Sequence, residues 1–266
     1  MNDDVKKESA LARKLRHFLD FSTQDVADII ALEQQEFSVA PRTELVSQDG
    51  EDQSYYVLLR GWAACLKLLP DGRRQIINFA VPGDFLGLRC FLLPKADHAV
   101  VTITEATVSQ FPQQRMVDLI RANPRFGAAV LWALSFEQAI VVEHLVNIGR
   151  RSALERTAHL LLELEARLEL VGLSGEGSFE VPATQEDLGD VLGLTTVHVN
   201  RVLRQLRTRE LIAIRQRRIE ILDRDRLQEL AQFTAGYLEH DRASRVAQLG
   251  AREMPAARPG RGARRR

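Results

Sequence analysis

Hydrophobic and polar positions follow two different periods along the chain. After a helical stretch over residues 21–32, which Ser22 can cap, short runs with β-branched or alternating apolar character extend to residue 111. They are FSVA, TELV, YYVLLRG, AACLKLL, RQIINFA, AVVTIT and ATVSQF. Turn residues separate the runs, and Asp71-Gly72 between two of them predicts a hairpin. About seven short strands at this spacing predict an antiparallel barrel or jelly roll.

Beyond residue 112 the period becomes helical. We expect a short helix over 113–121, a long one over 125–148 and another over 153–170. The long helix carries a seam whose members are spaced by 3, 4, 3, 4 and 3 residues: Leu131, Leu134, Gln138, Val141, Leu145 and Ile148. Such heptads favour packing against a second copy of the helix, although a long core helix packing on its own barrel is the alternative. The sequence GRRS at 149–152 breaks the pattern and suggests a hinge.

The next elements match a helix-turn-helix. Thr184 is a candidate N-cap with Asp187 three residues later, which is a variant capping box for a short helix over 185–192. Gly189 is small and would allow a second helix to approach closely. Gly193 suits the left-handed position that ends a helix. Apolar positions, a small residue and a turn glycine at these offsets together predict two packed helices.

The second of these helices is basic and runs from Thr195 or Thr196 to about residue 207, with Val199 and Val202 facing the first helix. Two short β-like runs follow within 211–222, joined by a basic loop. This hairpin is typical of the wing of a winged helix, and its basic tip suits phosphate contacts. We therefore expect the basic helix to read double-stranded DNA.

The distribution of charge along the chain also points to a polyanionic partner of the C-terminal half. The net charge is zero, but residues 1–149 hold 15 Lys and Arg against 19 Asp and Glu, whereas residues 150–266 hold 21 against 17, and every basic residue there is arginine. The stretch 241–266 is arginine-rich, and we expect it to be disordered.

There is no signal-peptide core, and no apolar run approaches the roughly 18 residues of a membrane span. A cytoplasmic protein with no membrane partner is expected. GxSxG, P-loop and HExxH motifs are missing, so an enzyme is not expected.

Two segments, YYVLLRGWAACLKLLPDGRRQIINFAVPGDFLGL and TQEDLGDVLGLTTVHVNRVLRQLRTRELI, resemble the CRP/FNR family of transcription regulators. The likeness extends over about residues 18–237. It implies an α+β chain with an N-terminal antiparallel β-roll sensor domain of the cyclic-nucleotide-binding type over 1–122. A dimerisation helix and hinge over 123–149 and a winged helix-turn-helix over 150–240 would follow, and then the tail.

The resemblance also implies which residues contact DNA. Arg201 matches the family's arginine, and its guanidinium can bridge O6 and N7 of guanine; the alternative is a solvent-exposed helix arginine. Asn200 suits adenine or a phosphate. Val197 departs from the glutamate of many members and offers only a methyl contact, for instance to thymine. The full candidate set is Thr196, Val197, His198 as a backbone contact, Asn200 and Arg201, with Arg217 and Arg218 on the wing.

The sensor domain departs from the family's ligand sites. Leu88 stands where cyclic AMP binders have a glutamate for the ribose, and His98 and Ala99 stand near the arginine and hydroxyl that hold the phosphate. We expect no cyclic AMP binding in the family manner. No cysteine precedes Cys65, so the N-terminal iron–sulfur cluster of the oxygen-sensing branch cannot be built.

Other chemistry in the sensor domain is sparse. The six histidines show no metal spacing, so no metal and no cofactor are expected. Cys90 is either a redox-reactive thiol activated by Arg89 or, as we favour, a small buried apolar residue. Arg73 and Arg74 are expected to be solvated.

Three functions stay open at this point: a signal-responsive regulator, a constitutive DNA-binding protein controlled by its abundance, and a ligand-binding protein whose winged helix docks another protein. The expected partners are double-stranded DNA and a second copy of the chain. RNA polymerase is a further candidate partner, but no motif marks a surface for it.

Overall fold

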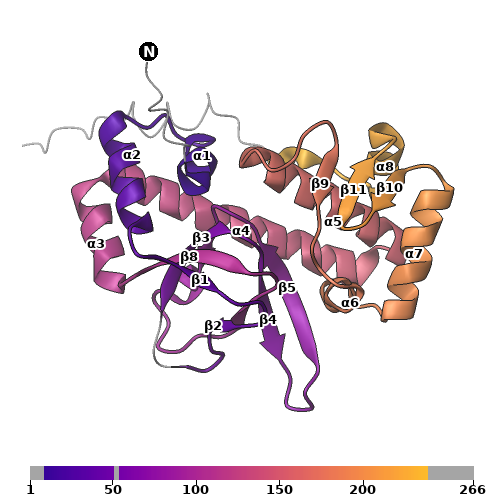
Figure 1. Ribbon diagram of the computed structural model, residues 1–266, viewed down its shortest axis with the longest axis horizontal. Coiled ribbons are helices and arrows are strands. Elements are labelled where there is room, and N and C mark those ends of the chain that lie inside the picture. The colour runs from indigo at the N-terminus through magenta and orange to yellow at the C-terminus, as the bar shows by residue number, and fades with distance from the viewer. Residues whose placement is uncertain (1–8, 51–53, 239–266) are drawn as a thin grey trace, which may run out of the picture.

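The computed structural model describes residues 9–50 and 54–238, which form a β-roll, a long helix and a C-terminal domain (Figure 1). The roll has two antiparallel four-stranded sheets, ordered β1-β8-β3-β6 and β2-β7-β4-β5. Its strands are β1 (Glu36–Val39), β2 (Glu44–Val46), β3 (Tyr55–Arg60), β4 (Ala63–Leu68), β5 (Arg74–Ala80), β6 (Phe85–Leu86), β7 (Ala99–Thr102) and β8 (Ala106–Phe111). Seven match the runs in the sequence, and the predicted hairpin joins β4 to β5.

Short helices surround the roll. They are α1 (Ala10–Arg16), α2 (Thr23–Ile30), the 3-10 turns η1 (Ala31–Glu33) and η2 (Leu88–Cys90), and α3 (Gln113–Ala122). The predicted cap of α2 is confirmed, because Ser22 and Asp25 form a capping box. The sequence analysis missed α1, whose Leu11 and Leu15 are fully buried. Its seven residues are too few for the helical period to be recognised.

The long helix α4 (Pro124–Arg150) is confirmed at 27 residues. Among the described residues it is the one helix long and apolar enough to cross a membrane by length and composition. Its buried face, however, carries Glu137 and His144, which pair with Arg89 and Glu163. Buried ion pairs with neighbouring elements are what a core helix of a folded domain forms.

The C-terminal domain begins after a two-residue break. Its elements are α5 (Ala153–Leu170), β9 (Ser178–Glu180), α6 (Gln185–Leu192), α7 (Thr196–Thr208), β10 (Ile212–Arg215), β11 (Arg218–Ile221), α8 (Arg224–Ala231) and η3 (Ala235–Tyr237). The break at the expected hinge is confirmed, and Ser152 starts α5 with a capping box. The winged helix is confirmed as well, with β9 as an additional third strand of the wing sheet.

A single hydrophobic cluster connects the two halves of the molecule. It includes Phe79 of β5, Ile140 of α4, Leu161 of α5, Leu188 of α6 and Val202 of α7. Each of these side chains is nearly or fully buried. The C-terminal domain is therefore packed onto the β-roll in this structure and is not separated from it by solvent.

A buried chain of charges runs through the same region. Asp84, from the sequence PGDF, pairs with Lys14 of α1 and, at 3.0 Å, with Arg167 of α5. Arg167 also pairs with Glu163, and Glu163 binds His144 of α4 at 2.9 Å. Because burial makes an unpaired charge costly, each member depends on its neighbours. The chain connects α1, the roll, α4 and α5.

Candidate nucleic-acid interface

The two helices of the helix-turn-helix meet at Gly189. A Cβ on Gly189 would lie 2.5 Å from the backbone oxygen of Leu194, so only glycine fits at this turn. Gly193 has the left-handed conformation that the sequence predicted, with φ of 62°. The capping box of Thr184 and Asp187 at the start of α6 is confirmed too. These local features fix the angle at which α7 leaves the turn.

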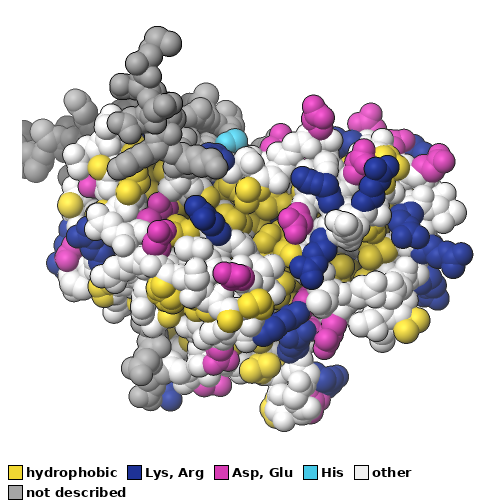
Figure 2. Space-filling model, viewed as in Figure 1, with side chains coloured by type: hydrophobic (Ala, Val, Ile, Leu, Met, Phe, Trp, Pro, Cys, Tyr) yellow, Lys and Arg dark blue, Asp and Glu magenta, His cyan; other side chains and the backbone are white. Residues whose placement is uncertain are grey.

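The first turns of α7 face solvent. Thr195, not Thr196, is the N-cap, and its side chain accepts a hydrogen bond from the backbone N–H of His198. Val197 is 77% exposed, and Thr196 is exposed beside it. Val199 and Val202, by contrast, are buried against the rest of the domain. The helix thus presents its polar and basic side outward, and Figure 2 shows Lys and Arg side chains gathered at the edge where α7 lies.

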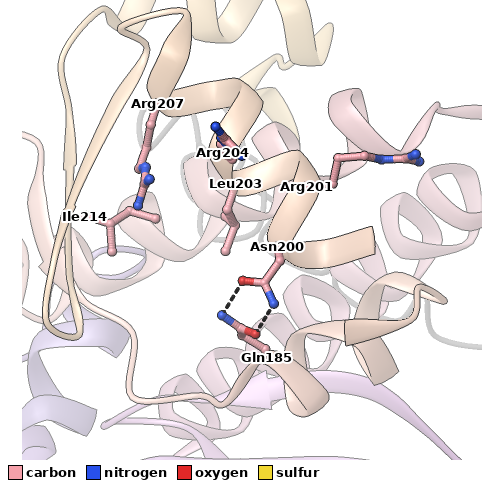
Figure 3. Close-up of a pocket in the computed structure, with 7 residues that line it drawn as sticks. All are labelled: Gln185, Asn200, Arg201, Leu203, Arg204, Arg207 and Ile214. Atoms are coloured by element: carbon pink, nitrogen blue, oxygen red, sulfur yellow. Dashed lines mark hydrogen bonds between the residues drawn. The ribbon is translucent and has the colours of Figure 1, made fainter. Parts of the chain in front are cut away.

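Two of the predicted DNA contacts already have partners in the chain. A guanidinium nitrogen of Arg201 lies 2.9 Å from Nε2 of His198. The amide of Asn200 exchanges two hydrogen bonds with the amide of Gln185, one of them 2.6 Å long. Figure 3 shows Asn200 turned toward Gln185 and Arg201 pointing away from both, and Arg201 is exposed. Arg201 is therefore the freer of the two to approach a base.

A groove of about 420 Å³ lies beside these residues and reaches from α7 to the wing strand β10. Arg201, Arg204 and Arg207 line it together with Gln185. The sequence analysis did not include Gln185, Arg204 or Arg207 in the site. The signal was present in the three-residue spacing of the arginines, which places them along one side of a helix.

The wing hairpin has an exposed basic tip. Arg215 and Arg218 pair across the hairpin, and Gln216 between them has a left-handed φ of 57°. Arg217 and Arg218, the two predicted wing contacts, are both exposed. Their guanidinium groups are thus accessible on the same domain as α7.

Helix α6 is clamped to the β-roll by charge. Arg42 donates two hydrogen bonds of 2.8 Å to the two carboxylate oxygens of Asp187. Arg74 at the start of β5 donates to Asp187 at 3.1 Å and to Asp190 at 2.5 Å. Arg42 holds φ at 63°, a conformation that residues other than glycine seldom adopt. Figure 1 shows β5 and α6 side by side. We call these four residues the interdomain clamp.

The contacts of Arg74 contradict the expectation that both Arg73 and Arg74 are solvated. Arg73 is solvated as expected, with its side chain 78% exposed, but Arg74 is only 25% exposed and is held by the aspartates of α6. Burial would raise the pKa of Asp187, yet hydrogen bonds from Arg42 and Thr184 lower it to about 2. The carboxylate is therefore ionised, and its capping and clamping bonds are present together, at any pH above the acid range.

Two residues that depart from the family's nucleotide ligands lie in the interior of the β-roll. Leu88 is buried, as is Ala99. Arg89 turns toward α4 and binds Glu137 at 3.0 Å. The alternative in which Arg89 activates Cys90 is not supported, because burial raises the pKa of the Cys90 thiol and the effect of Arg89 is smaller. The favoured reading, a buried Cys90, is confirmed.

Comparisons with known proteins agree with this architecture. Residues 36–123 match the family model of the cyclic nucleotide-binding domain, and residues 155–230 match that of the Crp-like helix-turn-helix domain. The nitrogen fixation regulation protein FixK of Bradyrhizobium diazoefficiens is 36% identical over 70% of this chain and 77% of its own length. The transcriptional activatory protein AadR of Rhodopseudomonas palustris is 34% identical over 72% and 79%. The structure of FixK2 from Bradyrhizobium japonicum superposes with a TM-score of 0.68 at 30% identity, covering 75% of this chain and 98% of FixK2.

Proposed function

Because the chain belongs to the CRP/FNR family of DNA-binding transcription regulators, we propose that it acts as a cytoplasmic homodimer on a pseudo-palindromic DNA site. Its β-roll would respond to a signal other than cyclic AMP or an iron–sulfur cluster. The observation that carries the proposal is the exposed basic side of α7, held at a fixed angle by the turn at Gly189.

Exposure of the seam on α4 supports the dimer. Leu131 is 68% exposed and Leu145 is 72% exposed, while Gln138 and Ile148 are exposed and Leu134 and Val141 are half-buried. These are the predicted seam positions, and only Leu134 among them is packed against the buried cluster that α4 shares with the β-roll. Exposed apolar side chains at heptad spacing, here Leu131, Leu145 and Ile148, are best covered by the same side chains of a second copy, since a two-fold axis makes the surface self-complementary.

The seam is tested by sedimentation. Leu145→Glu should shift the protein from dimer to monomer, because two buried carboxylates would then face each other across the axis. Leu92→Glu is the matched control, since Leu92 is 88% exposed on the β-roll and lies outside the seam. A dimer that survives Leu145→Glu, or one lost equally in Leu92→Glu, would contradict this assignment.

DNA reading is tested by sequencing genomic fragments captured by the purified protein without added ligand. The proposal expects an enriched two-fold motif that Arg201→Ala loses, because the first turns of a recognition helix contact base edges. Arg209→Ala serves as the control, as Arg209 lies at the other end of α7. Capture unaffected by Arg201→Ala would contradict the assignment of α7 as the reader.

Val197 should set one base of the motif. Its exposed methyl groups can contact thymine but accept no hydrogen bond from cytosine. In the same capture assay, Val197→Glu should shift that base pair toward C·G, because a carboxylate accepts from the cytosine amino group. An unchanged preference would mean that Val197 does not face the bases.

The proposed signal would reach the DNA-binding domain through the interdomain clamp, since Arg42 and Arg74 belong to the β-roll and their aspartates to α6. Cyclic AMP is an unsuitable ligand, because Leu88 cannot accept from a ribose and Ala99 cannot donate to a phosphate. Titration calorimetry with cyclic AMP should show no binding, and micromolar binding would contradict this part of the proposal.

The salt dependence of binding distinguishes a winged helix that binds DNA from one that docks another protein. Affinity for DNA should fall steeply as salt rises, because bound phosphates release counterions. Replacing Arg217 by alanine should reduce the slope of log affinity against log salt by about 1. A slope near zero in the unaltered protein would favour protein docking instead.

A further inference from the structure

A cluster of three possible metal ligands lies in the β-roll, in the segment between β6 and β7, away from the DNA-binding face of α7. Cys90 ends η2, and Asp97 and His98 directly precede β7. The Cys90 sulfur lies 3.3 Å from Oδ1 of Asp97 and 3.6 Å from Nδ1 of His98. The imidazole nitrogen and the carboxylate oxygen are 2.6 Å apart. All three ligand atoms thus converge on one point.

We infer that Cys90, Asp97 and His98 bind a divalent transition-metal ion of the zinc type, with water as the fourth ligand. The donor set is a thiolate, an imidazole and a carboxylate, which are the ligands that zinc takes in proteins. Three protein ligands and one open position are typical of zinc sites that exchange a ligand.

The sulfur–nitrogen separation fits tetrahedral coordination. With Zn–S of about 2.3 Å and Zn–N of about 2.05 Å, a tetrahedral site separates sulfur from nitrogen by about 3.6 Å, which is the separation seen between Cys90 and His98. The nitrogen–oxygen pair must open to about 3.3 Å. Asp97 can supply this movement, because its side chain is 67% exposed, whereas that of His98 is only 4% exposed.

The backbone around the cluster holds the ligands in place. The Cys90 N–H donates to the Gly87 carbonyl, and the Cys90 carbonyl accepts from Leu93. Ala96, just before the other two ligands, is tied to residues 49–50 by two backbone hydrogen bonds. The buried thiol and imidazole are therefore preorganised, and the exposed carboxylate marks the side from which an ion enters.

Binding exchanges protons for the metal in a balanced step. The ion replaces the proton of the Cys90 thiol, which is released to solvent, and His98 binds through Nδ1 with its remaining proton on Nε2. The Asp97 carboxylate gives up its hydrogen bonds to both neighbours and coordinates instead. Oxidation states do not change.

This site could not be recognised from the sequence, because its ligands are separated by seven positions and by one, which is not a recognised zinc spacing. One residue connects the site to α4. Arg89, adjacent to Cys90, binds Glu137 of that helix. A metal that repositions η2 would therefore act on the proposed dimer helix, a consequence that rests on the proposed function.

Cobalt titration of the reduced, metal-free full-length protein tests the site itself. We expect one Co²⁺ per chain, a thiolate-to-cobalt band in the near ultraviolet, and displacement by Zn²⁺. Loss of an outer-shell partner alone costs about 10- to 100-fold in metal affinity, so Cys90→Ser should cost at least about 100-fold. Cys65→Ser is the matched control, since Cys65 is the other buried cysteine.

A second variant keeps the test decisive if Cys90→Ser unfolds. Asp97 is exposed, so Asp97→Asn should fold, and it should weaken Co²⁺ binding at least about 10-fold. An unaltered affinity in Asp97→Asn, a missing thiolate band, or a band lost only in Cys65→Ser would overturn the inference.

DNA affinity with and without Zn²⁺ tests the coupling separately. If Zn²⁺ changes the DNA affinity of the unaltered protein but not that of Glu137→Gln, the result would support transmission through Arg89. Stoichiometric metal binding with unaltered DNA affinity would overturn the coupling but not the site. Failure to bind DNA in either condition would contradict the proposed function, while the cobalt result would still decide the metal site.

Discussion

Replacing Arg74 by alanine removes the arginine that contacts both aspartates of α6. Asp187 has a pKa of about 2 instead of 3.8, and at about 1.4 kcal/mol per pH unit its partners together favour the ionised form by roughly 2 kcal/mol. Part of this belongs to Thr184, which lies in the same domain, and the share of Arg42 is reduced by solvent, since its side chain is 42% exposed. With the added contact to Asp190, Arg74→Ala should cost about 1 kcal/mol of the free energy of unfolding.

Urea unfolding of Arg74→Ala and Arg73→Ala measures this directly. Arg73 is the neighbouring residue, it is solvated, and it pairs only with the exposed Asp71 among the contacts of the described residues, so its loss should cost less than about 0.5 kcal/mol. A double-mutant cycle of Arg74→Ala with Asp190→Asn should give a coupling of at least about 0.5 kcal/mol. Equal stabilities of the two arginine variants, or zero coupling, would refute the clamp.

The acid limb of the stability curve gives an independent check of the interdomain clamp. The pKa of Asp187 is lowered on folding, so its stabilisation is present above pH 3.8 and is lost as the pH falls toward 2. Arg42 is the largest cause of this lowering, so Arg42→Ala should flatten the limb, whereas Arg73→Ala should leave it unaltered.

Three further predictions concern the buried charges and the turn. Asp84→Asn leaves two buried cations short of a partner and should cost about 3–5 kcal/mol in urea unfolding; a cost below about 1 kcal/mol would contradict the charge chain. Burial lowers the pKa of His144, but Glu163 outweighs this and raises it, so the stabilisation is complete below about pH 6.5 and is lost as the pH rises through the folded pKa. His144→Gln should abolish this loss of stability with rising pH, as measured by unfolding across this range. An unaltered pH dependence would contradict the contribution of the His144–Glu163 pair. Gly189→Ala should cost about 1–3 kcal/mol by thermal unfolding, because its Cβ meets the Leu194 oxygen; a neutral effect would contradict the close approach.

The winged helix was predictable because its signals are local. The cap at Thr184, the small residue at position 189 and the left-handed glycine at 193 lie within ten residues of one another, and all three take the conformations that their chemistry favours. The strands of the roll were predictable for the same reason, since turn residues separate alternating runs.

The clamp and the metal ligands could not be read from the sequence. Arg42 and Asp187 are 145 positions apart in the chain. In the sequence, each of them looks like an ordinary charged surface residue. Asp187 was recognised as a capping residue, but its second role depends on how the domains pack. Cys90 and His98 are eight positions apart, and they come together only through the way the segment between η2 and β7 folds, which no periodic pattern in the sequence indicates.

The central claim is that two copies of α7, joined through the seam on α4, read two half-sites about one helical turn (~34 Å) apart. Fluorescence anisotropy on the captured motif, and on the same motif with five base pairs inserted at its centre, tests this most directly. The inserted half turn places the second half-site on the opposite face of the DNA. Affinity for the DNA with the insertion should fall to that of a single half-site, and Arg201→Ala should weaken binding to both DNAs. Equal affinity for the two DNAs would contradict the paired reading.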